Sequence, residues 1–162
     1  MLQHEEFEKI SVRLICQTAN INRSTFYAHF EDKYQLATVV FQEQMKDFMR
    51  HHPAATFPFG RDFVWELLVG TRSFIDDIAE TWGYGFSSLI PLVQEQLQTD
   101  LQTILNFQLR TADLNLTPHQ KDWLAKSLSA SLFYLIQDSH KRKIDFSSLK
   151  NDLLPVIYPT LD

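Results

Sequence analysis

The sequence predicts an all-α protein with an N-terminal helix-turn-helix domain and a C-terminal helical domain. Apolar residues recur at helical spacing along most of the 162-residue chain. Only four glycines occur, and the alternating Val/Thr-rich runs typical of strands are scarce. A loop rich in Pro and Phe, at 53–60, divides the chain. We therefore expect an N-terminal domain at 1–50 and a C-terminal domain at 51–162.

The N-terminal domain is predicted to be built on two short helices joined by a tight turn. The first covers about 12–19 and follows Ser11, a favourable N-cap residue. Asn20 then breaks the pattern, because Asn tolerates the left-handed conformation that ends a helix. Asn22 is expected to cap the second helix, Arg23–Phe30. Two such helices indicate a helix-turn-helix.

Residues around the second helix are assigned packing and capping roles. Ile21 is expected to act as an apolar plug in the turn. Phe26 and Phe30 stand at i and i+4, so both are expected to face the core and anchor the helix. Asp32 is expected to cap a third helix, with Gln35 completing a capping box.

The segment 21–33, INRSTFYAHFEDK, resembles the DNA-binding domain of the tetracycline-repressor (TetR) family. Phe-Tyr-x-His-Phe-x-x-Lys is the most specific part of this resemblance, and SVRLICQTA before it is similar to the second helix of the family. The resemblance covers about residues 7–40; beyond that, it implies only an all-helical domain of variable sequence. It implies DNA-contacting roles for Arg13, Arg23, Ser24, Thr25, Tyr27, His29 and Lys33.

The same residues suit DNA recognition on chemical grounds. A helix that enters the major groove needs short polar side chains at its N-terminal turn and phosphate donors along its flank. Arg23 can reach the O6 and N7 atoms of guanine in a bidentate manner. Tyr27 and His29 can donate to phosphates, and Lys33 stands in the first turn of the next helix. An isolated Tyr-x-His pair is usually solvated surface, so the prediction depends on the complete pattern.

The resemblance also implies a complete first helix before residue 12, of which only Met1–Ile10 is present. A natural truncation, a start assigned too far downstream and an engineered fragment all fit this. A three-helix unit buries little surface even when complete. We therefore expect exposure of Ile15, Cys16 and Phe30 unless another part of the chain covers them, and weaker DNA binding than in a form with a complete first helix.

Charge and motif content limit the function classes. The net charge is −5, and residues 1–52 carry six Lys/Arg and seven Asp/Glu, so tight non-specific DNA binding is not expected. G-x-S-x-G, H-E-x-x-H, a phosphate loop and a Cys/His ligand set are all absent from the sequence, so we predict no enzyme, cofactor or metal. A single cysteine, no recognisable signal peptide and no apolar run of membrane-spanning length favour the cytoplasm.

The C-terminal domain is expected to consist of long amphipathic helices. Thr117-Pro118-His119-Gln120 is the clearest helix start, with an N-cap, Pro at the first helical position and Gln three residues after the cap. Helices after the motif are predicted at about Lys33–Arg50, Arg61–Trp82, Ser87–Thr111, Pro118–Lys141 and Ser148–Leu161.

The last two predicted helices are expected to pair with those of a second copy in a four-helix bundle. The helix at 118–141 carries apolar residues on more than one face, and one small domain cannot bury them all. A symmetric partner can. The predicted homodimer interface consists of Leu124, Leu128, Leu132, Leu135, Leu153 and Ile157.

Aromatic residues concentrated between 61 and 111 indicate a cavity for an apolar or aromatic effector. Ordinary core packing explains the same residues and remains open as the alternative. The predicted pocket residues are Phe63, Trp65, Phe74, Trp82, Tyr84, Phe86 and Phe107.

These features predict a TetR-type transcriptional regulator. A homodimer would bind a near-palindromic double-stranded DNA operator and respond to a small-molecule effector. The alternative is a helical dimerisation or protein-interaction module that has lost autonomous DNA binding.

Overall fold

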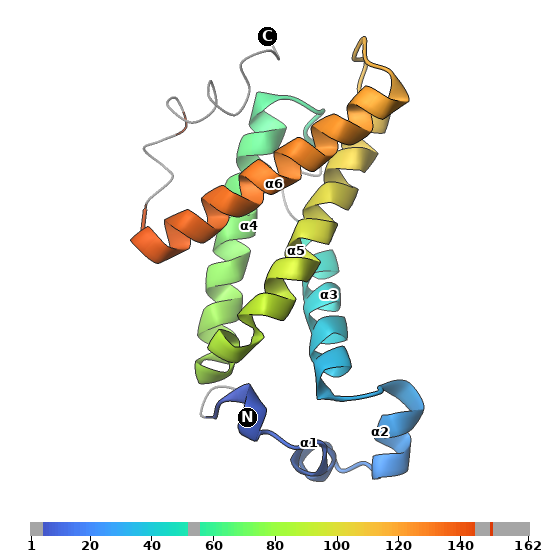
Figure 1. The fold of residues 1–162 in the computed structure, drawn as a ribbon, viewed down its shortest axis with the longest axis vertical. Coiled ribbons are helices and arrows are strands. Elements are labelled where there is room, and N and C mark those ends of the chain that lie inside the picture. The colour runs from blue at the N-terminus through green and yellow to red at the C-terminus, as the bar shows by residue number, and fades with distance from the viewer. Residues whose placement is uncertain (1–4, 52–55, 145–149, 151–162) are drawn as a thin grey trace. The chain divides into compact units, whose positions relative to one another are not determined.

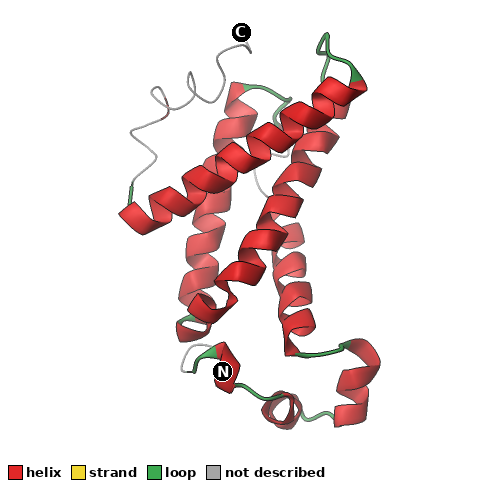
Figure 2. Ribbon diagram, in the orientation of Figure 1, coloured by secondary structure: helices red, strands yellow, loops and turns green. Residues whose placement is uncertain are grey.

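A computed structural model describes residues 5–51, 56–144 and Lys150, and over these residues all regular structure is helical (Figure 2). The prediction of an all-α protein is thus confirmed. The predicted helix Ser148–Leu161 lies outside the described residues apart from Lys150. In chain order, the elements are the 3-10 helix η1 (Phe7–Lys9) and the α-helices α1 (Val12–Ala19), α2 (Arg23–His29), α3 (Lys33–His51), α4 (Arg61–Trp82), α5 (Tyr84–Thr111) and α6 (Pro118–Arg142) (Figure 1).

Three helix ends follow their local sequence signals. The Ser11 hydroxyl accepts a hydrogen bond from the Leu14 amide at 3.2 Å, and α1 ends at Asn20 in the left-handed conformation. Thr117 and Gln120 form the complete capping box of α6 through reciprocal side-chain and backbone hydrogen bonds. These predictions are confirmed, because each depends on atoms only a few residues apart.

Two capping predictions differ in detail. Asn22 occupies the N-cap position of α2, but its side chain forms no cap hydrogen bond. Asp32 accepts hydrogen bonds from the amides of Tyr34 and Gln35, as expected for a cap. In a regular capping box, the Gln35 side chain would accept a hydrogen bond from the amide of Asp32. It accepts instead from the amide of Glu31, the residue before the cap.

Four predicted helix boundaries differ from the structure by one to three residues, and two of these differences are that α3 and α6 each end one residue later than expected. Phe30 is the C-cap of α2 with an extended backbone, so the helix ends at His29. Helix α5 begins at Tyr84 and not at Ser87, because Gly83 alone makes the turn from α4 with a positive φ of 53°. Pro91 consequently lies inside α5 and not in its first turn.

The chain forms two compact units that interleave in the sequence. Unit 1 comprises Met1–Asp47 and Asp77–Gln96, and unit 2 comprises Phe48–Asp76 and Leu97–Asp162. Helices α4 and α5 therefore each contribute one part to either unit. This division into compact units differs from the predicted domain boundary at residue 50. The division into functional domains at 1–50 and 51–162 stays a prediction.

Unit 1 has its own apolar core, to which η1 and the five helices α1 to α5 contribute. Phe41 of α3 is fully buried, and its ring lies 6.5 Å from that of Trp82, near the end of α4. The buried apolar residues of this unit are Phe7, Ile10, Cys16, Phe26, Ala37, Phe41, Met45, Ile78, Trp82, Phe86, Leu89 and Val93.

Unit 2 combines an apolar core with a buried polar connection between α4 and α6. Arg72 donates a hydrogen bond to the Ser139 hydroxyl at 2.8 Å and forms an ion pair with the Asp76 carboxylate at 2.9 Å. Ser139 in turn donates to the carbonyl oxygen of Ile136 at 2.8 Å. The buried apolar residues of this unit are Phe63, Val64, Trp65, Leu67, Leu68, Phe74, Ile75, Leu97, Leu101, Leu105, Leu109, Ala125, Leu128, Leu132 and Ile136.

Across the described ranges, none of the helices combines the length and apolar character needed to cross a lipid bilayer.

The capping box at the start of α6 provides a test of the fold. We expect Thr117→Ala to lower the free energy of unfolding by about 1 kcal/mol, because the Gln120 amide loses its side-chain acceptor. Urea denaturation followed by circular dichroism measures the change. Thr103→Ala is the control, because this exposed threonine lies within α5 and caps no helix. Equal losses in the two variants would contradict the capping role.

Candidate nucleic-acid interface

The turn between α1 and α2 is held by backbone hydrogen bonds. The left-handed Asn20 brings the Ile21 amide to 3.0 Å from the carbonyl oxygen of Cys16, which closes the end of α1. The turn then enters α2 directly at Arg23 (Figure 1). Ile21 does not plug this turn as predicted. Its side chain is 40% exposed, because the hydrogen bonds alone already define the reversal.

One aromatic side chain anchors α2. Phe26 is 1% exposed, and its ring lies 5.4 Å from the rings of both Tyr27 and Phe30. Phe30 is only half-buried, since it follows the last helical residue. The predicted anchoring pair is therefore one buried residue, Phe26, supported by a partly covered second ring.

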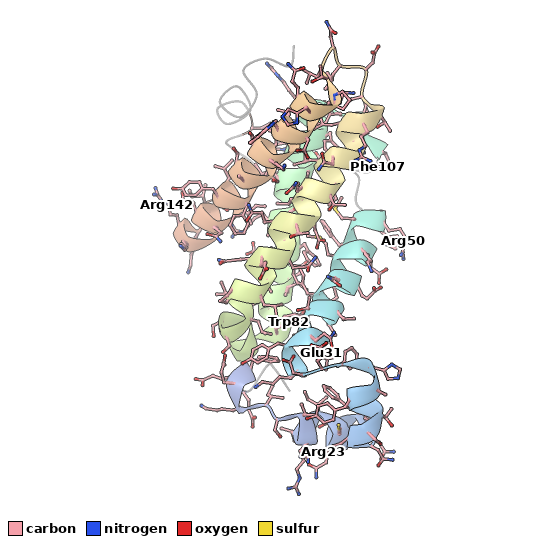
Figure 3. The ribbon with its side chains drawn as sticks, turned by 45° about the vertical axis from the view of Figure 1, so that its right-hand side comes forward. Arg23, Glu31, Arg50, Trp82, Phe107 and Arg142 are labelled. Atoms are coloured by element: carbon pink, nitrogen blue, oxygen red, sulfur yellow. The ribbon has the colours of Figure 1, made fainter. Side chains whose placement is uncertain are left out.

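The remaining face of α2 is open to solvent. Arg23, Ser24, Thr25, Tyr27 and His29 are all exposed, and Tyr27 is exposed by 57%. The structure thus brings these five predicted residues together on one short helix, with Arg23 in its first turn (Figure 3). This face offers a guanidinium, two short hydroxyls, a phenol and an imidazole, which are the groups that contact bases and phosphates.

Arg13 adds a second guanidinium on the neighbouring helix α1. Its side chain is exposed. Within the described parts of the chain, neither Arg13 nor Arg23 forms an ion pair with a carboxylate. Both guanidinium groups are therefore available to an external anion such as a phosphate oxygen.

Lys33 has a different environment from the phosphate donor that we predicted. Its ammonium donates to three carbonyl oxygens: that of Phe7 at 2.8 Å and those of Glu8 and Ile10 at 3.0 Å. It also lies 4.7 Å from the centre of the Phe7 ring. An ammonium has three N–H donors, so in this arrangement none is left for a phosphate. The structure assigns Lys33 to holding η1 against the start of α3.

This contact explains the burial of residues that were expected to be exposed. With η1 held by Lys33, the Phe7 and Ile10 side chains enter the core, and the Phe7 ring packs edge-on against Tyr34 at 5.1 Å. Cys16 is buried, and Ile15 and Phe30 are half-buried. The exposure expected for uncovered residues is therefore not found for Cys16 and is only partial for Ile15 and Phe30.

Glu8 provides a further attachment of η1. The hydrogen bond from Ser88 lowers the pKa of the Glu8 carboxyl most, followed by the hydrogen bond from its own backbone amide, and the charge of Lys33 lowers it further. Because this pKa is lowered in the fold, the contribution to stability is present above the ordinary carboxyl pKa. It is lost as the pH falls through the lowered value.

The structure places the predicted effector residues in different surroundings. Phe107 is 68% exposed (Figure 3), so it faces solvent. Trp82 and Phe86 belong to the core of unit 1. Phe63, Trp65 and Phe74 belong instead to the core of unit 2. The effector cavity stays a prediction, because aromatic composition alone does not tell which core each ring enters; nothing is described of the Tyr84 side chain.

The predicted dimer interface also needs correction. Leu128 and Leu132 are buried within unit 2, and Leu132 has no exposed surface. Leu124 and Leu135 are half-buried. A residue that fills the core of its own chain cannot present the same side chain to a partner. The other two predicted residues, Leu153 and Ile157, lie outside the described residues.

A different face of α6 is exposed. Trp123, Ser127, Ala130 and Tyr134 recur at spacings of three and four residues, so they form one stripe along the helix. Trp123 and Tyr134 are large exposed hydrophobic residues. Sequence analysis missed this stripe, because its small central residues make a weaker apolar signal than the leucines on the core face.

The fold and the exposed face of α2 define an all-helical protein with a helix-turn-helix at its N-terminus. Residues 1–40 match the sequence profile of the family described as bacterial regulatory proteins, tetR family. Comparisons with curated proteins and with solved structures gave no match. Over residues 1–40, the chain is therefore similar to the N-terminal region of tetR-family DNA-binding regulators.

The position of Lys33 predicts a structural effect of its removal. We expect Lys33→Met to lower the free energy of unfolding by about 1.5–3 kcal/mol, because three carbonyl groups lose a charged donor. Chemical denaturation monitored by circular dichroism measures this loss.

Lys46→Met on the same helix is the matched control. Lys46 forms an exposed ion pair with Glu43, at 2.7 Å, and its loss is expected to change stability by less than about 0.5 kcal/mol. If Lys33→Met is as stable as Lys46→Met, the three carbonyl contacts do not hold η1 in place.

Proposed function

We propose that the protein is a transcriptional regulator that binds a near-palindromic double-stranded DNA operator as a homodimer. Helix α2 would be the recognition helix in the major groove. The observation that carries this proposal is the exposed polar face of α2 above its buried anchor, Phe26. A helix anchored on one side and polar on the other can enter a groove without losing its core contacts.

Each exposed residue has a distinct proposed role. Arg23 would read a guanine through its O6 and N7 atoms, with Ser24 and Thr25 close to the neighbouring bases. Tyr27 and His29 would donate to phosphates on the flank of the groove, and Arg13 to phosphates beside α1. Lys33 would contribute indirectly by holding the chain before α1, so this proposal does not include it among the phosphate donors.

The charge distribution is compatible with selective rather than general DNA binding. Residues 1–52 are nearly neutral, with six basic and seven acidic residues. Non-specific binding is driven by counterion release, which scales with the number of DNA phosphates that the protein neutralises. A protein with few phosphate contacts therefore has a weak affinity for DNA of arbitrary sequence. Specificity would therefore depend on direct base contacts more than on long-range attraction.

The homodimer would form through the exposed stripe of α6. Trp123 and Tyr134 supply large apolar surface at its two ends, while Ser127 and Ala130 allow another helix to approach closely between them. A two-fold axis through the middle of such a stripe places the small residues of one helix opposite those of the other. In the bound dimer, the two recognition helices must lie about 34–36 Å apart to reach successive major grooves.

A small-molecule effector and a cytoplasmic location complete the proposed function. The effector would shift the operator affinity by binding one conformation of the dimer more tightly than the other.

Base reading by Arg23 can be tested on an operator selected from random DNA. We expect Arg23→Ala to weaken operator binding by about 1–3 kcal/mol and to relax specificity at one base position of each half-site. Fluorescence anisotropy against the selected operator and its single-base variants measures both effects. Arg110→Ala, which removes an exposed arginine near the end of α5, should bind as the unmutated protein does.

Arg13→Ala separates a phosphate contact from a base contact. It should weaken binding to all DNA sequences equally. The slope of the logarithm of the affinity against the logarithm of the salt concentration should become shallower by about one. If the unmutated protein selects no sequence at all, the regulator proposal is wrong and the interaction-module alternative gains support.

The dimer face can be tested separately from DNA binding. We expect Ala130→Glu to convert a dimer into a monomer, because two carboxylates would meet near the symmetry axis without partners. Sedimentation velocity over a range of protein concentrations measures the change. Gln98→Glu introduces a similar charge at an exposed position of α5 and should leave the dimer intact. A dimer that survives Ala130→Glu would exclude this stripe as the interface.

A further inference from the structure

Unit 1 contains an apolar cavity of about 300 Å³. Four segments of this unit surround it: η1 with the residue that follows it, α1, the first half of α3, and the end of α4. The cavity is lined by Phe7, Ile10, Ile15, Thr18, Ala19, Lys33, Leu36, Ala37, Val40 and Trp82. None of the predicted DNA-contacting residues other than Lys33 belongs to this lining.

The lining has a fixed floor and an open rim. Phe7, Ile10, Ala37 and Trp82 are buried, so they keep their positions through contacts behind the cavity. Thr18, Ala19 and Val40, by contrast, are exposed at the rim. This combination gives a concave site that a molecule can enter from solvent, with walls already held in place.

The chemistry of the walls selects the kind of molecule. The Phe7 and Trp82 rings and the aliphatic side chains offer dispersion contacts. The one charged group, Lys33, directs its three N–H donors to backbone carbonyl oxygens. The lining therefore provides shape and apolar surface but no free ammonium donor, which favours a neutral ligand over an anion. A volume of about 300 Å³ corresponds to the smaller ligand sites in proteins.

We propose that this cavity binds a compact, neutral, apolar small molecule with an aromatic ring system. The site lies in the DNA-binding unit and is separate from the effector cavity predicted between later helices. An occupant would contact Ile15 and Thr18 of α1 together with Leu36 and Val40 of α3, and so connect the two helices. Opening of α1 away from α3 would then require loss of the ligand contacts as well. The α1 amides would therefore be better protected against hydrogen exchange when the ligand is bound.

The neutral fluorophore phenylnaphthylamine is a suitable probe, because its emission rises in apolar surroundings. We expect saturable binding of one probe molecule per chain to the full protein in the absence of DNA. Hydrogen exchange of the α1 amides should slow when the probe is bound. Since no operator is present, the result does not depend on the proposed regulatory function.

Two matched pairs of variants locate the probe. Val40→Asp places a carboxylate at the rim and should weaken binding at least about tenfold. Val39→Asp changes the neighbouring exposed valine, which does not line the cavity, and should bind normally. Thr18→Phe should block the cavity by filling it, whereas Gln17→Phe on the adjacent exposed position should not. Circular dichroism confirms that each variant is folded.

Three outcomes would overturn the proposal. The first is equal probe affinity in the lining variants and in their controls, which would mean adsorption elsewhere. The second is no saturable binding by the unmutated chain. The third combines two observations: the protein stops binding the probe at concentrations at which it is a dimer, and Val40→Asp prevents the dimer from forming. Together they would mean that a second copy of the chain occupies the cavity.

Discussion

The contact between the Lys33 ammonium and three carbonyl oxygens is the interaction on which the N-terminal unit depends. The chain from Phe7 to Ile10 forms one short 3-10 turn, in which the Ile10 amide already donates to the Phe7 carbonyl oxygen at 3.1 Å, and backbone carbonyl groups that leave water need such partners. One half-buried cation satisfies three of them and brings two apolar side chains into the core. Helix α1 begins immediately afterwards, so its position is set by the same contact. A turn of only three residues connects α1 to α2, so the position of α1 also determines the position of the exposed face of α2.

Features determined by neighbouring residues could be predicted from the sequence. The caps at Ser11 and Thr117 and the left-handed Asn20 depend on atoms within one helical turn. The exposed face of α2 was predictable for the same reason. In a seven-residue helix with a single buried aromatic residue, Phe26, the remaining polar side chains can only point outward.

Features that depend on which surface meets another helix could not be predicted. Leu128 and Leu132 looked like a contact with a partner, because a strong apolar seam fits a core and an interface equally well. Phe107 looked like part of a pocket on composition alone. Lys33 was misassigned because its acceptors lie 23 to 26 residues earlier in the chain, and no local pattern reports such a contact. In each case the residue type was compatible with two environments, and only the packing decides between them.

The division of α4 and α5 between the two units has a consequence for biosynthesis. Unit 1 takes its core from residues up to 47 and again from 77–96, including Trp82 and Leu89. A ribosome releases the chain from its N-terminus onward, so the helix-turn-helix emerges well before the residues that complete its core. Its stable folding must wait until α5 has begun to leave the exit tunnel. During that interval, the apolar side chains of Phe41 and Met45 of α3 are not yet enclosed by the complete core.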